Sequence, residues 1–160
     1  MIISMFIVQS FLFFQDVIES VKIRTSLKSS ERILCTNDLK RVTTSQNGIP
    51  VYLYTDLLIL SNIPSRIPGS ICGLFIDGTY GIFINESFIK ESPSFQSSSI
   101  SHEEGHIVLN HIDTNDLTID EKDIAADIYS YQQGNDVITM LNTMKYHGYV
   151  VGHRIKSIQH

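Results

Sequence analysis

The sequence predicts a single α+β domain in which a small antiparallel sheet precedes a helical second half. Three observations lead to this prediction. The chain has 160 residues, which is typical of one domain with a buried core, so we treat residues 1–160 as one unit. Residues 71–76 and 81–85 are β-rich runs separated by Asp77-Gly78-Thr79-Tyr80, which predicts a hairpin. From residue 99 onward the apolar spacing and the capping signals are instead those of helices.

The N-terminal segment is apolar and its spacing favours a helix. Residues 1–15 carry no charged side chain, and apolar residues then recur at intervals of three and four: Ile7, Phe11, Phe14, Ile18 and Val21. This predicts a core-packing helix over roughly residues 3–23. The apolar run is too short to span a bilayer, and no Lys or Arg precedes it as in a signal peptide. We therefore expect a cytoplasmic protein, with a membrane anchor at residues 1–14 as the alternative.

The remaining elements follow from turn and capping signals. Residues 32–36 and 49–54 read as strands, with the turn signal Asn47-Gly48 before the second, and residues 61–70 as a loop. Residues 99–111 are predicted to form a helix with Ile100, Ile107 and Val108 at inward positions. A second helix begins with a capping box of Thr118 and Glu121 and ends at Gly134. A third runs from about residue 135 to about residue 148.

The composition excludes some classes of function. The net charge is −5, and the 12 Lys and Arg residues are scattered, so we expect no nucleic-acid partner. Two cysteines, Cys35 and Cys72, are too few and too far apart for a disulfide framework or a cysteine-rich zinc site. We expect both to be buried thiols in a reducing compartment.

One motif carries recognisable chemistry, the run His102-Glu103-Glu104-Gly105-His106. Histidines four residues apart lie on one face of a helix, where both imidazoles reach one zinc ion. Glu103 points to the open side of the metal, where it takes a proton from water that zinc has acidified. The motif therefore predicts Zn²⁺ bound by His102 and His106, with Glu103 as general base in peptide-bond hydrolysis.

A catalytic zinc ion needs a third protein ligand. Leu109 and Ile112 exclude the metzincin pattern, and His111 is predicted to point away from the other two histidines. The next helix offers Asp123 and Asp127, four residues apart, and the small residues Ala125 and Ala126 allow it to approach closely. We predict Asp123 as the ligand and Asp127 as an acceptor for a ligand histidine's free N–H.

Other acids near this site have simpler interpretations. Glu121 is the rival ligand, although its capping position gives it a structural role, and Asp127 also remains possible. Asp120 and Asp136 are interpreted as ordinary first-turn acids.

These motifs resemble small zincin-like metallopeptidase domains of gluzincin type. His102 to His111, followed by Ala126-Asp127-Ile128-Tyr129-Ser130, is similar to the ImmA/IrrE family and to related phage-encoded peptidases. The similarity covers roughly residues 49–135, and it implies a minimal zincin-like fold with Asp123 in the place of the metal-binding glutamate. The chain departs from that family in having an aspartate ligand, Ala125 in place of a second glutamate, and no helix-turn-helix domain.

Two functions are weighed. The first is a zinc metallopeptidase that acts on a protein or peptide laid as an extra strand beside the zinc helix. Phe83 and Asn85 are then candidates to line the cleft, unless they belong to the core, and His147, Tyr149 and His153 are candidate oxyanion donors that are more often surface residues. The second is a non-catalytic zinc-binding regulatory or peptide-binding protein that retains the same scaffold.

Overall fold

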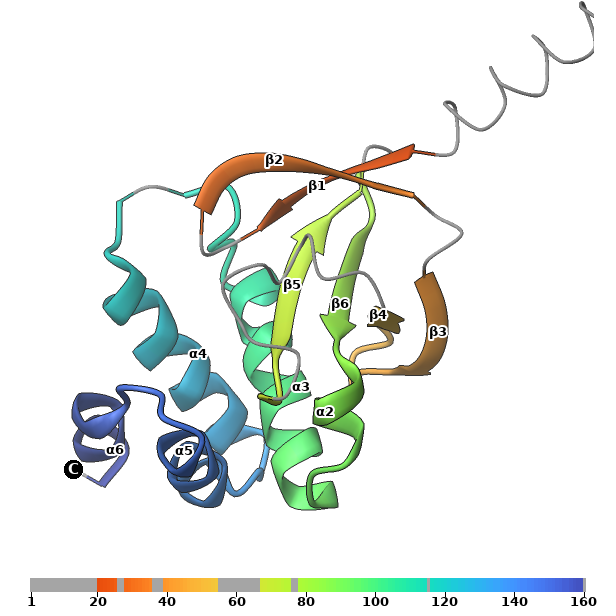
Figure 1. The fold of residues 1–160 in the computed structure, drawn as a ribbon. Coiled ribbons are helices and arrows are strands. Elements are labelled where there is room, and N and C mark those ends of the chain that lie inside the picture. The colour runs from red at the N-terminus through yellow and green to blue at the C-terminus, as the bar shows by residue number, and fades with distance from the viewer. Residues whose placement is uncertain are drawn as a thin grey trace, which may run out of the picture.

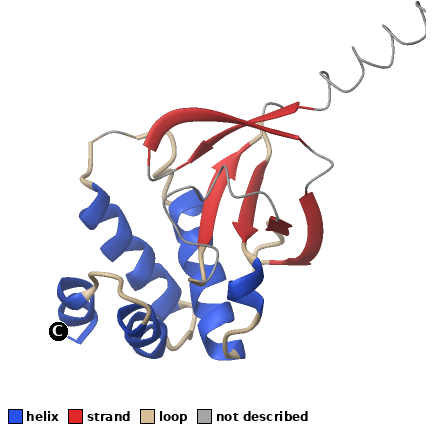
Figure 2. Ribbon diagram, in the orientation of Figure 1, coloured by secondary structure: helices blue, strands red, loops and turns tan. Residues whose placement is uncertain are grey.

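A mixed sheet with helices along one side forms the protein. The computed structural model describes residues 20–25, 28–35, 39–54, 67–75, 78–114 and 116–159. Its strands are β1 (Ser20–Thr25), β2 (Lys28–Cys35), β3 (Leu39–Thr44), β4 (Pro50–Tyr54), β5 (Ser70–Leu74) and β6 (Tyr80–Ile84). Its helices are α2 (Glu86–Ile89), α3 (Pro93–Val108), α4 (Ile119–Gln132), α5 (Val137–Tyr146) and α6 (Gly152–Gln159). Figure 1 labels these elements, and Figure 2 shows the helices gathered at one side of the sheet. The predicted α+β class is confirmed.

The sheet is larger than predicted and contains one parallel pair. Its described strands lie in the order β2-β1-β5-β6-β4-β3. β5 and β6 form the predicted antiparallel hairpin, with Cys72 opposite Ile82, whereas β4 and β6 run parallel. β3 was not predicted because it is an edge strand whose side chains after Leu39 are exposed, so it lacks the alternation that marks a half-buried strand.

The predicted N-terminal helix is wrong over residues 20–23. These residues belong to β1, which pairs with β2 so that Val21 lies opposite Leu34. The spacing of Val21 from Ile18 suits a helix, but pairing with β2 decides the conformation. The rest of that prediction, residues 3–19, lies outside the described residues. Among the helices that are described, none is long and apolar enough to cross a membrane.

Helix boundaries follow capping chemistry. α3 begins earlier than predicted, because Ser92 accepts a hydrogen bond from the backbone N–H of Phe95 and Pro93 occupies the first turn. The capping box of Thr118 and Glu121 starts α4 as predicted. α4 ends at Gln132, just before Gly134, whose φ of +84° suits the predicted stop. α2 and α6 are too short to give a periodic signal, and neither was predicted.

The apolar core lies between the sheet and the helices. It is built from Val51, Ile82, Ile84, Phe88, Phe95, Val137, Met140, Leu141 and Val151. Ile100 and Ile107 pack against it as predicted. Val108 does not, since 52% of it is exposed at the end of α3. Cys72 is buried as predicted. The side chain of Cys35 is not among those that the structure describes, so the prediction for Cys35 stays a prediction.

α3 contributes Phe95 to this core, but the buried part of the helix that follows is polar. It carries His102, Glu103, Glu104 and His106, each no more than 8% exposed. Burial of ionisable groups costs free energy unless they are paired or bound to a metal. The buried polar side chains of α3 therefore mark a candidate functional site.

Candidate metal centre

α3 presents two imidazoles to one point in space. His102 and His106 are one helical turn apart, and their Nε2 atoms lie 3.1 Å from each other. Two nitrogen lone pairs at this distance repel unless a proton or a cation lies between them. Both side chains are buried, at 8% and 3% exposure. The spacing of the motif thus produces the convergence that the sequence predicted.

α4 supplies the third group. The Oδ1 atom of Asp123 lies 3.4 Å from Nε2 of His106, and the ligand atoms of His102, His106 and Asp123 all lie within 4.8 Å of one another. Ligands about 2.0–2.1 Å from a tetrahedral zinc ion are about 3.3–3.4 Å apart, which the two short distances approach. Two imidazoles and a carboxylate are also a usual ligand set for zinc. The residues present therefore fit a zinc ion.

A glycine lets α4 approach closely enough for an aspartate to reach. A Cβ atom added to Gly105 would lie 3.0 Å from Cδ1 of Tyr129 and 3.1 Å from Cα of Ala126. Ala126 is fully buried against α3, as its small size predicted. The close approach of the two helices brings the short side chain of Asp123 to His106.

Asp127 holds the first histidine. Its Oδ1 atom lies 2.8 Å from Nδ1 of His102, so Nδ1 carries a proton and Nε2 keeps its lone pair for a metal. Burial alone would lower the pKa of His102, but the hydrogen bond and charge of Asp127 outweigh it and raise that pKa. Burial would raise the pKa of Asp127, and hydrogen bonds from Arg154 and His102 lower it instead. The geometry matches the role predicted for Asp127.

His111 holds the second histidine, contrary to the prediction that it points away. α3 ends at Val108, and Asn110 adopts a φ of +57°, so the chain turns back and buries His111 beneath the helix. The Nδ1 atoms of His106 and His111 are 3.0 Å apart. Burial, with the nearby charges of His106 and Lys122, lowers the pKa of His111 to about 4. A neutral His111 can accept a hydrogen bond from the Nδ1–H group of His106, and Nε2 of His106 then faces His102 and Asp123.

Glu103 faces the sheet beside this cluster. Its Oε1 atom accepts a hydrogen bond of 2.9 Å from the hydroxyl of Ser70, and its Oε2 atom accepts one of 2.9 Å from the backbone N–H of Cys72. Both donors belong to β5, so the start of this strand fixes the carboxylate. Glu103 is not among the three ligand groups, although it borders the same cavity.

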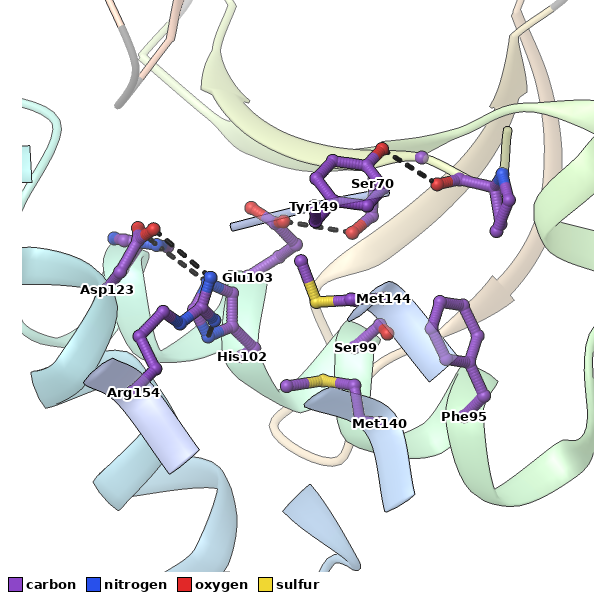
Figure 3. Close-up of a pocket in the computed structure, with 13 residues that line it drawn as sticks. Ser70, Phe95, Ser99, His102, Glu103, Asp123, Met140, Met144, Tyr149 and Arg154 are labelled. Carbon is purple, nitrogen blue, oxygen red and sulfur yellow. Dashed lines mark hydrogen bonds and ion pairs between the residues drawn. The ribbon is translucent and has the colours of Figure 1, made fainter. Parts of the chain in front are cut away.

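The cavity has a polar side and an apolar side. Its volume is about 170 Å³. Figure 3 shows His102, Asp123 and Arg154 at the left, Met140 and Met144 in the middle and Phe95 at the right, with Glu103 next to His102 and with Ser70 and Tyr149 above the methionines. A void of this size is comparable to the roughly 150 Å³ cavities that accept benzene, so it accommodates one apolar side chain.

Two residues that line the cavity come from the C-terminal segment, where the sequence contains few recognisable signals. Arg154 is 5% exposed and donates to Asp127 and Asp123, and no motif predicted it. The one available signal was that two aspartates on one helix face need a counter-ion. Tyr149 also lines the cavity and donates to the carbonyl of Pro68 at 3.1 Å. Burial and the charge of Glu103 raise the pKa of Tyr149 to about 12.

The other acidic candidates lie away from the site. Glu121 is exposed and completes the capping box, so it does not compete with Asp123 as a ligand. Asp136 caps α5 through the N–H of Thr139. Asp120 is exposed at the start of α4.

The other histidines and the predicted cleft residues also point elsewhere. His147 pairs with Glu91, and His153 with Asp120, so neither faces the cavity. Phe83 and Asn85 do not line the cavity either. Phe83 is buried between the rings of Tyr52 and Phe75, and Asn85 caps α2.

No protein-family model matches the chain, and no curated protein and no solved structure matches it. The fold and the site geometry describe an α+β protein in which two histidines and one aspartate form a cluster that could hold a metal ion.

Proposed function

We propose that this protein is a zinc-dependent metallopeptidase with a zincin-like fold, as its resemblance to the ImmA/IrrE-like peptidases implies. One observation carries the proposal: the carboxylate of Glu103 borders the same cavity as His102, His106 and Asp123 without belonging to the ligand group. A site that only binds metal has no need of such a carboxylate. A hydrolytic site needs one beside the place where water is activated.

The residues divide the chemistry among them. His102, His106 and Asp123 would hold the zinc ion, which when bound acidifies water and polarises the substrate carbonyl. Glu103 takes the proton of the attacking water at a carboxylate oxygen and delivers it to the amide nitrogen of the leaving group. Its Oε1 atom is suited to this, because the hydroxyl of Ser70 that bonds it can rotate away.

The shape of the cavity suits a peptide. Gly69 and Ser70 line the cavity at the start of β5. The described residues of β1 pair with the other end of β5, at Gly73 and Leu74. An extended substrate beside Ser70 adds to the sheet by main-chain hydrogen bonds. The side chain next to the scissile bond then enters the apolar half formed by Phe95, Met140 and Met144.

The test of this function is reconstitution. We expect one zinc ion per chain, cleavage of peptides that carry an apolar residue beside the scissile bond, loss of cleavage with a chelator, and recovery on adding zinc. Elemental analysis and mass spectrometry of a peptide library measure these outcomes. Zinc binding without cleavage of any peptide would refute the peptidase.

Tyr149 is the candidate donor to the oxyanion of the tetrahedral intermediate. Its hydroxyl is protonated at neutral pH, and its side chain lines the same cavity as Glu103. We expect Tyr149→Phe to lower kcat roughly 10²–10³-fold, as removal of one oxyanion donor does elsewhere, with the zinc content unchanged. Steady-state kinetics of Tyr149→Phe beside Tyr146→Phe, an exposed tyrosine of α5, check this. Equal kcat values would remove Tyr149 from the mechanism.

A specific observation also supports a non-catalytic zinc-binding protein as the second candidate. Both carboxylate oxygens of Glu103 accept hydrogen bonds from β5, so this side chain also fastens α3 to the sheet. If that is its whole role, Glu103→Ala lowers the melting temperature by removing both hydrogen bonds, and the wild-type protein binds peptides without cleaving them.

A further inference from the structure

Arg154 is a buried cation inside a site that we propose for another cation. Its side chain is 5% exposed and belongs to α6, the last helix of the chain. An arginine is almost never buried unless it is paired. Here its Nε donates to Oδ2 of Asp127 at 2.7 Å, Nη2 donates to Oδ1 of Asp127 at 2.7 Å, and Nη1 donates to Oδ2 of Asp123 at 3.2 Å.

We infer that Arg154 is the positioning residue of the metal site: it holds the ligand Asp123 and the outer partner Asp127 in place and couples zinc binding to the docking of α6. The inference rests on the proposed zinc site.

The contacts of the two aspartates carry the first part of this inference. Asp123 turns Oδ2 to Arg154 and Oδ1 to Nε2 of His106, so one oxygen is fixed while the other remains for the metal. Asp127 receives two parallel bonds from Arg154, and its Oδ1 atom also meets Nδ1 of His102. The guanidinium of Arg154 therefore holds the carboxylate of Asp123, which is the proposed third ligand. It also holds the carboxylate of Asp127, which contacts the proposed ligand His102. A lysine offers no such planar fork.

The charges explain why a cation is tolerated here. Around the cavity, Glu103, Asp123 and Asp127 are acidic and Arg154 is basic. With neutral imidazoles these groups leave a net charge of −2, which one divalent ion neutralises. Without Arg154 the metal-free protein would bury an excess of carboxylates, a costly arrangement.

Two effects of the guanidinium oppose each other, and their balance decides the expected result. Its charge repels a metal ion, whereas its hydrogen bonds fix Asp123 and Asp127. Loss of an outer partner of a metal ligand typically weakens metal binding about 10–100-fold, even though the ligands themselves remain. Arg154 is such a partner for both Asp123 and Asp127. We therefore expect the gain from holding these carboxylates in place to outweigh the repulsion between Arg154 and the metal ion.

The coupling follows from the position of Arg154 on α6. This helix packs on α4 and α5, and Ile155 and Ile158 rest against the core. If Arg154 in its docked position strengthens zinc binding, zinc must strengthen the docking of α6 by the same factor. The stability of the docked position of α6 therefore depends on whether the metal is bound.

The test compares Arg154→Met and Arg154→Lys with Lys156→Met, a change at an exposed residue of the same helix. Zinc dissociation constants come from competition with a chelator, the visible spectrum of bound Co²⁺ reports ligand geometry, and hydrogen exchange reports α6. We expect about 10–100-fold weaker zinc binding and an altered Co²⁺ spectrum in both Arg154 variants, and no change in Lys156→Met. Zinc should slow exchange over residues 152–159 in the wild type but not in Arg154→Met. Equal or tighter zinc binding by Arg154→Met would overturn the inference.

A second pair of variants covers the case in which Arg154→Met does not fold. Asp127→Asn keeps an oxygen that accepts the hydrogen bond from His102. Combined with Arg154→Met, it removes both partners of the buried Asp127–Arg154 ion pair, so no unpaired charge is left by that pair. We expect this double variant to bind zinc more weakly than Asp127→Asn alone, because Asp123 has lost its partner. Equal affinities would refute the positioning role. A wild-type protein that binds no zinc would instead reject the proposed function and this inference with it.

Discussion

Glu103→Gln is expected to lower kcat roughly 10²–10⁴-fold while the zinc content stays at one ion per chain, since this is the range that a positioned general base contributes. The amide has nearly the size of the carboxylate, and its oxygen still accepts the N–H of Cys72 while its NH₂ group donates to the hydroxyl of Ser70. The fold is therefore retained. What is lost is the ability to take a proton from water and pass it to the leaving nitrogen.

The matched control is Glu86→Gln, which makes the same chemical change at an exposed position in the first turn of α2. We expect no change in kcat for that variant. Peptide cleavage and zinc content are measured side by side, with melting temperatures to exclude unfolding. A Glu103→Gln protein that cleaves at the wild-type rate would rule out the mechanism.

Asp123→Ala should weaken zinc binding by more than the roughly 100-fold that loss of an outer partner costs, because it removes one of three ligands. The change also removes the carboxylate partner of Nη1 of Arg154, so less of the positive charge of Arg154 is neutralised. Both effects act against a divalent cation. Chelator competition at neutral pH measures the dissociation constant, and elemental analysis measures the zinc that remains after purification.

Asp120→Ala is the control, since Asp120 lies on the same helix with 73% of its side chain exposed. Its contact with His153 is a surface pair, which contributes little to stability. Unchanged zinc affinity in Asp123→Ala would show that the ligand set is wrong and would return attention to His102 and His106 alone.

Local patterns were sufficient for the central part of the site. The four-residue spacing of His102 and His106 fixes their common face once the segment is helical, and the capping box at Thr118 sets the start of α4, so that Asp123 and Asp127 share a face. The β5–β6 hairpin and the stop at Gly134 also depend on signals within a few residues. Such features are set by backbone and side-chain geometry over one or two turns, which a sequence displays directly.

Errors arose where strand pairing or the end of a helix, and not the apolar spacing, decides the conformation. Val21 lies in a strand because β2 pairs with it, although its spacing suits a helix. His111 is buried against His106 because α3 ends three residues earlier, whereas a continued helix would turn it away.

The sequence by itself determined the chemistry of this site: the histidine pair, the carboxylate beside them, and the acidic helix that follows. Only the tertiary structure decided what surrounds these groups. Ser70 and the N–H of Cys72 reach Glu103 from a strand some 30 residues away, and Arg154 reaches Asp127 from the last helix. Periodicity and motifs report neighbours along the chain, but the pairing of buried charges depends on which elements pack together, and that follows from the burial of the whole core.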